Sequence, residues 1–385
     1  MTSNGLFDIP GVQPPPDYER DSHAQAMRRT RNKFRQHPVP TKPMSQQGTK
    51  WTTLNTAHAD GPPDDVLPLV QWFENQDEGR HRFRWTLRDS IDELLDGQRT
   101  GRWCYQHLTK TEKTYLGTAI EINLTREFSI ADGADLDWNI DGFEVDCKFS
   151  KDLGGWEIPM EMYECADHGQ RSGKANHPAL LVWVNDDSHQ WAAGVLRITD
   201  ERLRWRKSPE SARERAYNRD NKRRIDPDAF DSIYWLWGGI QTDLPTNLLL
   251  HMDHKTREKI LIPGSSGQQR VNALFRHVTD RLVNRQTVLA VGQQDDAPKR
   301  VRDARDDLRD EGIVIIGHQT PYPAICDALG LVHPHKGSWM SVRVTEVDDS
   351  DVRPKFSVQG RWWAVAQEGE SGPAPKLGLE SQILA

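Results

Sequence analysis

Two aspartates lie at a spacing that can place their carboxylates side by side. They belong to the segment ADLDWNIDGFEVDCKFS, residues 134–150. Asp141-Gly142 is typical of a two-residue hairpin loop, and the flanking residues alternate between apolar and polar types. If this pair forms the loop, Asp137 on the first strand faces Asp146 on the second. The pattern therefore predicts two carboxylates on one face of a β-hairpin.

Carboxylates in this arrangement need a positive group beside them. Their Cβ atoms would be about 4.5–5.5 Å apart, and like charges at that distance destabilise a strand pair. Lys148 lies two residues after Asp146 and therefore on the same face. A divalent cation is the other candidate, because Mg²⁺ favours one or two carboxylates together with water and a substrate phosphate. Glu121, on a predicted helix before the hairpin, can direct a third carboxylate to the same sheet edge.

Three acids and a lysine around one cation suit the hydrolysis of a phosphodiester bond. The metal would neutralise the scissile phosphate and lower the pKa of a bound water. The lysine would hold that water and stabilise the charge that develops in the transition state. The spacing D-x8-D-x-K also arises by chance in a chain this rich in charge. The residues alone leave open a metal-dependent nuclease and a structural carboxylate–lysine cluster.

The helices and strands that must position these side chains indicate a mixed α/β domain. A helix is expected to end at Asp96-Gly97 and another to follow Thr111, its expected N-cap. Apolar residues of the second helix recur every four positions, at Leu116, Ile120, Leu124 and Phe128. The period then changes to two, and residues 179–184 and 191–198 are predicted strands joined by a polar turn.

Composition limits the class of protein. The chain has 385 residues, 36% hydrophobic and 28% charged, with a net charge of −7, which suits two domains and a tail. The negative charge argues against binding nucleic acid through bulk positive charge. No apolar run is long enough to span a membrane, and the N-terminus lacks the pattern of a secretory signal. Four cysteines without a CxxC pair fit a reducing cytoplasm rather than a disulfide framework.

Two stretches concentrate positive charge. Residues 1–65 are predicted to be a disordered, proline-rich tail that carries the run Arg28, Arg29, Arg31, Lys33 and Arg35. That run is either a solvated arm or an arm that contacts nucleic acid. Residues 201–224 hold ten Lys or Arg and four acidic residues. They form either a solvated helix face or a phosphate-contacting surface.

A second domain is expected after a linker at 238–246. It would occupy residues 247–370, after a first domain at 66–237 and before a loose C-terminus at 371–385. Residues 298–310 predict a charged helix with Val301, Ala304 and Leu308 on its inner face. Strands are expected at 313–316, 340–344 and 356–364, whereas the period of residues 287–291 is ambiguous.

Several segments resemble the NaeI family of type II restriction endonucleases, in the PD-(D/E)xK nuclease superfamily. They include LLDGQRTGRW, KTEKTYLGTAIEINLTREF, DGFEVDCKFS, NRDNKRR and QQDDAPKRVR. The similarity runs in order through about residues 85–366. It leaves out the first 65 residues, and this chain has extra residues around 164–178. The resemblance implies a restriction-endonuclease-like mixed sheet with flanking helices, followed by a winged-helix (helix-turn-helix) DNA-binding domain.

The resemblance also implies roles for five residues of the hairpin region. Asp137 and Asp146 would be the metal ligands, and Glu121 would complete the metal shell from its helix. Lys148 would position the attacking water. The backbone carbonyl of Cys147 would be a further ligand, with its thiol in the core. The implied cofactor is Mg²⁺.

In the second domain the resemblance implies a helix-turn-helix. Residues 287–291 would begin its second helix, and residues 298–310 would be its recognition helix. The residues expected to contact DNA are Lys299, Arg300, Arg302, Arg305, Arg309, Gln293 and Gln294. Arginine in the major groove reads guanine O6 and N7. Aspartates interrupt this basic series, so an ordinary charged helix remains the alternative.

The function expected from these features is Mg²⁺-dependent, site-specific cleavage of both strands of a palindromic DNA site. A cytoplasmic homodimer would match the two-fold symmetry of such a site, and the family implies activation by a second DNA copy on the C-terminal domain. One alternative is a DNA-binding regulator with a vestigial nuclease centre. Another is a DNA nicking-rejoining enzyme, although no tyrosine or serine occupies a recognisable activated setting.

Overall fold

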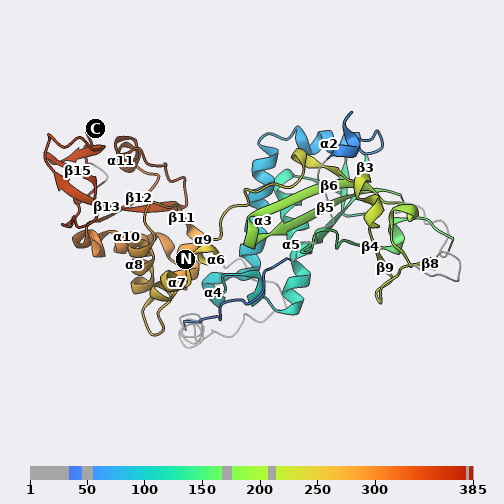
Figure 1. Ribbon diagram of the computed structural model, residues 1–385, viewed down its shortest axis with the longest axis horizontal. Helices are drawn as coiled ribbons and strands as arrows, with labels where there is room; N and C mark the ends of the chain where they lie inside the picture. Colours follow the sequence, from blue (N-terminus) through green and yellow to red (C-terminus); the bar gives the residue numbers. More distant parts are fainter. Residues whose placement is uncertain (1–33, 46–54, 167–175, 207–213, 379–380, 385) are drawn as a thin grey trace, which may run out of the picture. The chain divides into compact units, whose positions relative to one another are not determined.

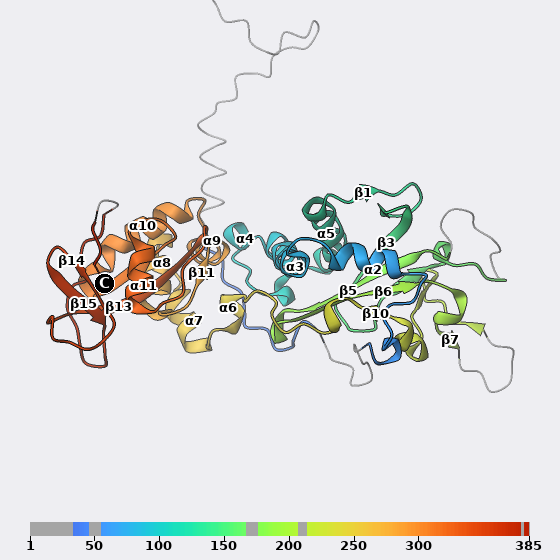
Figure 2. The ribbon, with the colours of Figure 1, turned by 90° about the horizontal axis from the view of Figure 1, so that it is seen from above.

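The computed structural model describes residues 34–45, 55–166, 176–206, 214–378 and 381–384, which fall into two compact units (Figures 1 and 2). The mixed-sheet unit contains residues 37–96 and 102–254. The described residues of the C-terminal unit are 34–36, 97–101 and those from 255 onward. A short N-terminal segment and the short helix that follows residue 96 therefore belong to the C-terminal unit.

A six-stranded sheet forms the centre of the mixed-sheet unit. Its order is β1-β2-β3-β5-β6-β10. Only β3 and β5 pair in parallel among these strands, so the sheet is mixed. The bounds are β1 Ala131–Asp132, β2 Trp138–Ile140, β3 Phe143–Ser150, β5 Pro178–Asn185, β6 Gln190–Arg197 and β10 Tyr234–Trp235. The predicted strands at 179–184 and 191–198 are thus confirmed as β5 and β6. Every residue of β5 is buried, as expected for a strand covered on both faces.

One face of this sheet packs on helices. These are α2 (Leu67–Glu74), α3 (Gly79–Leu95) and α5 (Lys110–Phe128), and their apolar residues share a core with Leu180 and Val182 of β5. The predicted four-residue spacing in α5 is confirmed, since all four of its named apolar residues are buried. The N-cap is Thr109 rather than Thr111. Thr109 and Glu112 form a reciprocal capping box, which satisfies two N–H groups that the helix start leaves without partners.

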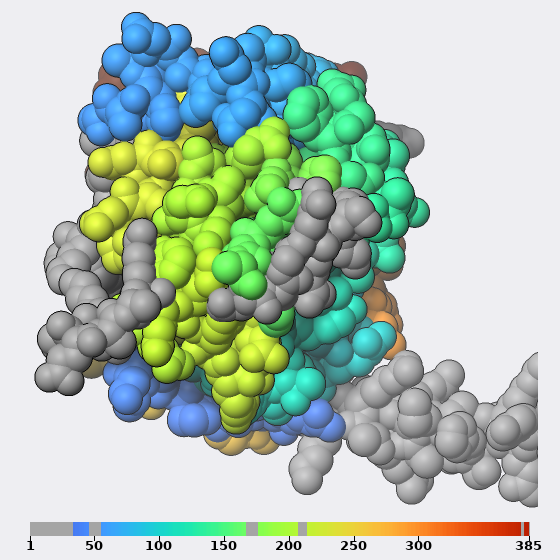
Figure 3. All heavy atoms as spheres, turned by 90° about the vertical axis from the view of Figure 1, so that its right-hand side faces the viewer, coloured from blue at the N-terminus to red at the C-terminus, as the bar shows by residue number. Residues whose placement is uncertain are grey.

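The other face of the sheet carries a second core. Alternate residues of β5, Ala179, Leu181 and Trp183, pack there against Trp156. Short strands enclose this core: β4 (Glu157–Pro159) pairs with β9 (Lys222–Arg224), and β7 (Trp205–Arg206) with β8 (Glu214–Arg215). Figure 3 shows the yellow-green segments of this region over the middle of one face, with blue N-terminal helices along an edge.

The described residues of the basic stretch 201–224 form the short strands β7, β8 and β9 and contain no α-helix, so a solvated helix face is not formed there. Arg223 is fully buried, and its guanidinium donates to the Leu203 carbonyl at 2.8 Å and contacts the Asp200 carboxylate. Arg215 donates to the same carboxylate at 2.6 Å. These two arginines therefore stabilise the fold, whereas Arg224 lies exposed. Lys207 and Arg213 lie outside the described residues.

The C-terminal unit combines helices with an antiparallel sheet (orange to red in Figure 1). Its sheet has the order β11-β13-β15-β14, and β12 also pairs with β13. The helices are α4 (Gly97–Thr100), α8 (Gly267–His277), α9 (Arg285–Gly292), α10 (Ala297–Asp307) and α11 (Tyr322–Leu329), and α6 (Leu248–His251) and α7 (His254–Ile260) lead into the unit. The strands are β11 (Val283–Asn284), β12 (Ile313–Ile316), β13 (Ser338–Val347), β14 (Lys355–Val358) and β15 (Arg361–Val365).

Several expectations for this unit are resolved. The ambiguous residues 287–291 lie in α9, and α10 buries Val301 and Ala304 on its inner side as predicted. The single strand expected at 356–364 is instead the hairpin β14–β15. Gln359 and Gly360 both have positive φ there and turn the chain back.

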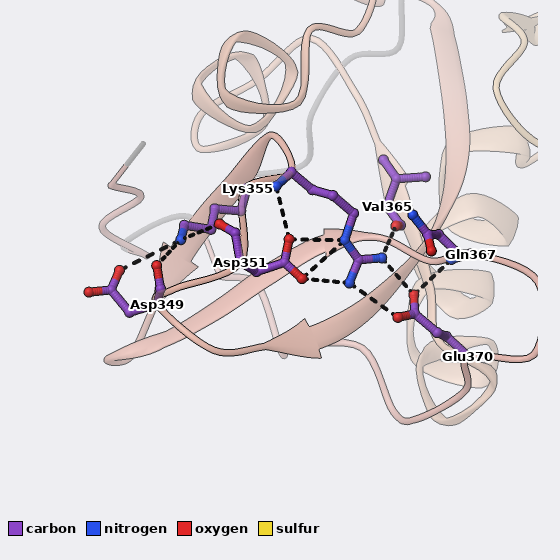
Figure 4. A network of polar contacts seen from close by, with 7 residues as sticks. Asp349, Asp351, Lys355, Val365, Gln367 and Glu370 are labelled. Atoms are coloured by element: carbon purple, nitrogen blue, oxygen red, sulfur yellow. Dashed lines mark hydrogen bonds and ion pairs between the residues drawn. The ribbon is translucent and has the colours of Figure 1, made fainter.

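A polar network fixes the loop between β13 and β14 (Figure 4). The Arg353 guanidinium donates to the Asp351 carboxylate at 2.8 Å and to the Glu370 carboxylate at 2.7 Å. Lys355 Nζ donates to the Asp351 carbonyl at 2.8 Å, and Glu370 also accepts from the Gln367 N–H at 2.8 Å. The loop is thereby attached to the segment that follows β15.

Two further observations bear on the sequence expectations. Residues 238–246, expected as a linker, lie within the mixed-sheet unit, where Gln241 and Trp191 exchange main-chain hydrogen bonds and Leu244 is buried. The two compact units divide at residues 254/255, and the functional domain bounds and linker stay predictions. In the described part of the chain, no helix is long and apolar enough to cross a membrane.

The position of the α5 cap gives a direct test. Thr109→Ala removes the side-chain acceptor of the capping box and is expected to lower the free energy of unfolding by about 1 kcal/mol. Thr111→Ala is the matched control, because Thr111 is an exposed residue within the helix and should leave stability within about 0.5 kcal/mol. Urea denaturation of both variants measures the difference. A larger loss of unfolding free energy in the Thr111 variant than in the Thr109 variant would contradict Thr109 as the N-cap.

Candidate active site

The predicted hairpin register is confirmed. Trp138 pairs with Val145, and Ile140 pairs with Phe143. Asp141 and Gly142 have φ values of 49° and 86°, the positive values that a two-residue turn of this kind requires.

This register brings the two predicted aspartates together. Asp137 immediately precedes β2, and its Oδ2 accepts the backbone N–H of Cys147 at 2.9 Å. Asp146 is only 4% exposed, and Lys148 Nζ lies 2.5 Å from its carboxylate. The expectation that Asp146 and Lys148 share a face is therefore confirmed.

The carboxylate pair is electrostatically strained. Burial raises the pKa of Asp146 to about 8, and the adjacent Asp137 carboxylate contributes to that rise. The Lys148 ammonium offsets only part of it. Burial and the neighbouring carboxylate therefore favour the protonated form of Asp146. A bound cation can take the place of that proton, since both stabilise negative oxygens held close together.

Glu121 approaches the pair from α5. The helix packs close to β3 at Gly117, where a Cβ atom would make ordinary van der Waals contact with the Phe149 side chain at 3.4 Å. One turn after Gly117, Glu121 is partly buried, and burial followed by the charge of Asp137 raises its pKa. Thr125 connects this helix to β2, because its hydroxyl accepts from Trp138 Nε1 at 2.7 Å.

The structure thus brings Asp137, Asp146 and Lys148 into contact and places Glu121 within electrostatic range of Asp137. Among the described residues, no three His, Cys, Asp or Glu side chains converge closely enough to bind a metal on their own. Any cation here would need further oxygens from the backbone, water or a substrate.

Cys147 has no role as a nucleophile in this arrangement. Its side chain is buried in the helix-side core with Val145, and burial raises the pKa of its thiol well above the usual value. A thiol in that state is not the reactive thiolate. Its backbone carbonyl remains the part expected at the site.

Glu144 is a positioning residue that the sequence did not reveal. Its carboxylate accepts three backbone N–H groups, of Ala134, Asp135 and Leu136, at 2.9–3.0 Å. Burial alone would raise its pKa, but these hydrogen bonds lower it to about 2. Glu144 therefore fixes the loop that leads directly into Asp137. The alternation of the hairpin places it opposite Asn139, which does not indicate a loop-binding role.

The residues expected to contact DNA separate into two groups. Lys299 and Arg302 are exposed on α10. In contrast, Arg300 pairs with Asp296 at 3.0 Å, and Arg305 donates to the Ile315 carbonyl at 2.9 Å.

The remaining three residues expected to contact DNA lie beside the ends of α9 and α10. Arg309 pairs with Asp310 at 3.2 Å. Gln294 buries its Oε1 without a hydrogen-bond partner among the described residues. Gln293 is 4% exposed and binds the backbone of Arg35. Lys299 and Arg302 are thus the clearest surface cations of the set.

A buried carboxylate pair with an adjacent lysine, on a mixed sheet flanked by helices, is the kind of site that can hydrolyse phosphodiester bonds once a cation is bound. The family model described as "Restriction endonuclease NaeI" matches residues 68–373. The chain is 41% identical over 317 residues to "Type II restriction enzyme NaeI" of Lentzea aerocolonigenes, covering 80% of this chain and 92% of that relative. The chain therefore belongs to the NaeI restriction endonuclease family and is a homologue of a type II restriction enzyme.

The role of Glu144 can be tested without touching the carboxylate pair. Glu144→Ala releases the loop before Asp137 and is expected to lower the cleavage rate about 10–100-fold, as for other residues that orient metal ligands. Measurement at several Mg²⁺ concentrations should show that more metal is needed for half-maximal rate.

Asp132→Asn, at an exposed position on the neighbouring strand β1, is the matched control and should leave that concentration unchanged. An Ala variant with normal metal dependence would show that Glu144 does not position Asp137.

Proposed function

We propose that this protein is a Mg²⁺-dependent endonuclease that cuts both strands of double-stranded DNA at a specific palindromic site. The observation that supports it most directly is the contact of the buried Asp146 carboxylate with Lys148, beside Asp137. The relative's printed name supports the restriction activity.

The donor set fits a hard cation. Asp137, Asp146 and the Cys147 carbonyl offer oxygen atoms only, and Mg²⁺ is bound by one or two carboxylates with water and phosphate completing its shell. Burial raises the pKa of Asp146, which is consistent with a cation beside the pair. When bound, Mg²⁺ would neutralise the scissile phosphate and lower the pKa of a water.

The residues of this chain then have distinct tasks. Lys148 holds the attacking water and stabilises negative charge on the phosphate oxygens during the attack. Glu121 completes the site from the helix side, directly or through a water. Asp137 and Asp146 would hold the cation, and the hairpin fixes their separation before substrate arrives, which avoids reorganisation during the reaction.

For the C-terminal unit we propose a winged-helix domain that binds a second DNA copy. The succession α8, α9 and α10 followed by the antiparallel strands β12 and β13 is consistent with that fold. Helix α10 would be the recognition helix, with Lys299 and Arg302 one turn apart on its exposed side. The functional domains at 66–237 and 247–370, the linker at 238–246, the disordered tail at 1–65 and the loose C-terminus at 371–385 remain predictions.

We also propose that the protein is a homodimer and that it acts in the cytoplasm. A palindromic site presents two equivalent scissile bonds, so a homodimer with two-fold symmetry would present one active site to each strand. All four cysteines are free, three of them buried, which is consistent with a reducing cytoplasm.

Substitution of the pair and its lysine tests the assignment. Asp146→Asn and Lys148→Met are each expected to reduce plasmid cleavage in Mg²⁺ by about 10²–10³-fold, on the scale of removing one catalytic electrostatic group. Equilibrium binding to DNA without a divalent cation should change little.

The matched control is Asp141→Asn, which removes a carboxylate from the same hairpin but keeps a residue suited to the turn. It should cut at the wild-type rate. Wild-type levels of cutting by either site variant would contradict the proposed site.

The same plasmid assay separates the alternatives. A regulator with a vestigial centre would bind DNA and never cut it, and a nicking-rejoining enzyme would leave a covalent protein–DNA adduct after denaturation. Sequencing of the cut ends identifies the recognised site.

Activation by a second DNA copy predicts a distinct effect of the α10 cations. A short duplex carrying the recognised site, added in trans, should speed cleavage of a one-site plasmid. Lys299→Gln with Arg302→Gln should lose most of this stimulation, about 5–150-fold in a typical coupled system, while unstimulated cleavage persists. Cleavage rates with and without the duplex measure it. Full stimulation in the double variant would argue against α10 as the effector surface.

A further inference from the structure

A small cavity in the C-terminal unit, which we name the α10 cavity, has a charged lining that is mainly cationic. Its walls come from the end of α10 and the turn after it, from β12, from the start of α11 and from the segment after Ala374. The charged residues that line it are Arg305, Asp306, Arg309 and Lys376. Three cations therefore share this space with one carboxylate, and none of the four has a task in the cleavage chemistry.

Arg305 is held in one position at this cavity. Its Nε donates to the Ile315 carbonyl at 2.9 Å, and its guanidinium carbon lies 4.5 Å from the centroid of the Tyr322 ring. Within the described part of the chain, that bond from Nε is the guanidinium's only hydrogen bond. The two terminal nitrogens of Arg305 are therefore donors that a bound molecule can use.

The charge of Arg305 is also poorly compensated. Burial lowers the pKa of its guanidinium, and the nearby charge of Asp306 offsets only part of that effect. An anion placed beside the guanidinium would stabilise its charged form. A fixed, partly desolvated arginine without a carboxylate in contact is thus the strongest feature of the α10 cavity.

The other two cations lie on a well-fixed wall. Arg309 belongs to the turn after α10, and its guanidinium pairs with Asp310 at 3.2 Å. The buried Ala374 donates its backbone N–H to the Arg309 carbonyl at 2.7 Å. This bond holds the segment that carries Lys376 beside the end of α10. Lys376 itself is exposed, so its ammonium is available to an incoming anion.

The size of the α10 cavity limits what it can take. Its volume is about 40 Å³, which is room for about three water molecules at about 10–15 Å³ each. A single tetrahedral oxyanion fits such a space, whereas a nucleobase does not. The planar fork of a guanidinium matches the oxygen atoms of a phosphate.

We propose that the α10 cavity binds one phosphate-type oxyanion, held by Arg305 together with Arg309 and Lys376. Inorganic phosphate and a phosphate group of a DNA backbone offer the same oxygen atoms, so either can be the source. The inference concerns the cavity alone and stands whether or not the C-terminal unit binds DNA.

Calorimetric titration of the full chain with inorganic phosphate, without divalent cation, tests the site. Chloride at the same ionic strength is the reference. Saturable binding is expected, with a Kd of about 1 mM or tighter. Arg309→Gln with Lys376→Gln should weaken it by about 10-fold or more, on the scale of losing a charge-assisted hydrogen bond. Lys336→Gln removes an exposed lysine of the same unit that does not line the cavity, and it should leave the Kd unchanged.

A second variant tests the role of the guanidinium fork. Arg305→Lys keeps the positive charge but loses the two-pronged donor, so it should also weaken phosphate binding by about 10-fold. Wild-type phosphate affinity in this variant would contradict the fork as the main contact. Circular dichroism and thermal melting show whether the variant is folded. If it is not, the variant of Arg309 and Lys376 decides the question, because both side chains reach solvent.

Competition with a short duplex of arbitrary sequence separates the two sources. If a DNA backbone supplies the phosphate, the duplex displaces inorganic phosphate, and the double Gln variant binds the duplex more weakly than Lys336→Gln does. If free phosphate is the source, it binds in the presence of the duplex, and the double Gln variant binds the duplex as Lys336→Gln does. Either result supports the site. An unchanged phosphate titration in the double Gln variant overturns the proposal, and so does a lack of phosphate binding together with unchanged duplex affinity.

Discussion

The close approach of two carboxylates governs the organisation of the mixed-sheet unit. Asp137 and Asp146 repel when both are charged, and burial makes the charged state of Asp146 still less favourable. The fold nevertheless holds them together, through the register of one hairpin, the Cys147 N–H on Asp137 and the Glu144 carboxylate on the preceding loop. Strain of this kind is typical of functional sites, where the surrounding structure determines a geometry that the residues alone would avoid.

The remainder of the unit gives the hairpin a rigid support. On one face, α5 packs close to β3 at Gly117 and is bonded to β2 through Thr125. On the other face, a tryptophan-rich core under β5 supports β3 from its neighbouring strand. The buried Arg88–Asp186 ion pair, with 2.7 Å between its atoms, joins α3 to the β5–β6 turn. A site held by packed helices and strands keeps its ligand geometry better than one on free loops.

Much of this was predictable from local pattern. The Asp-Gly turn and alternating residues determined the hairpin register, and the four-residue spacing determined the buried face of α5. Long-range partners were not predictable in the same way. The polar turn after β5 gave no sign that Asp186 is fully buried against Arg88. The basic run at 201–224 did not reveal that Arg223 is enclosed. The resemblance suggested Gln293 as a DNA contact, and nothing in the sequence indicated its hydrogen bond to Arg35, 258 residues away. Charge and spacing indicate which residues are polar, whereas tertiary packing decides which of them meet solvent.

The central claim is that the Asp137–Asp146 pair exchanges a proton for a divalent cation. Calorimetric titration of Mg²⁺ into the protein, repeated in buffers of different ionisation enthalpy, counts the protons released. Because the pKa of Asp146 is about 8, binding at neutral pH should release about one proton per ion, and Asp146→Asn should abolish both binding and release. Binding without proton release, or unchanged binding by the Asn variant, would contradict the account.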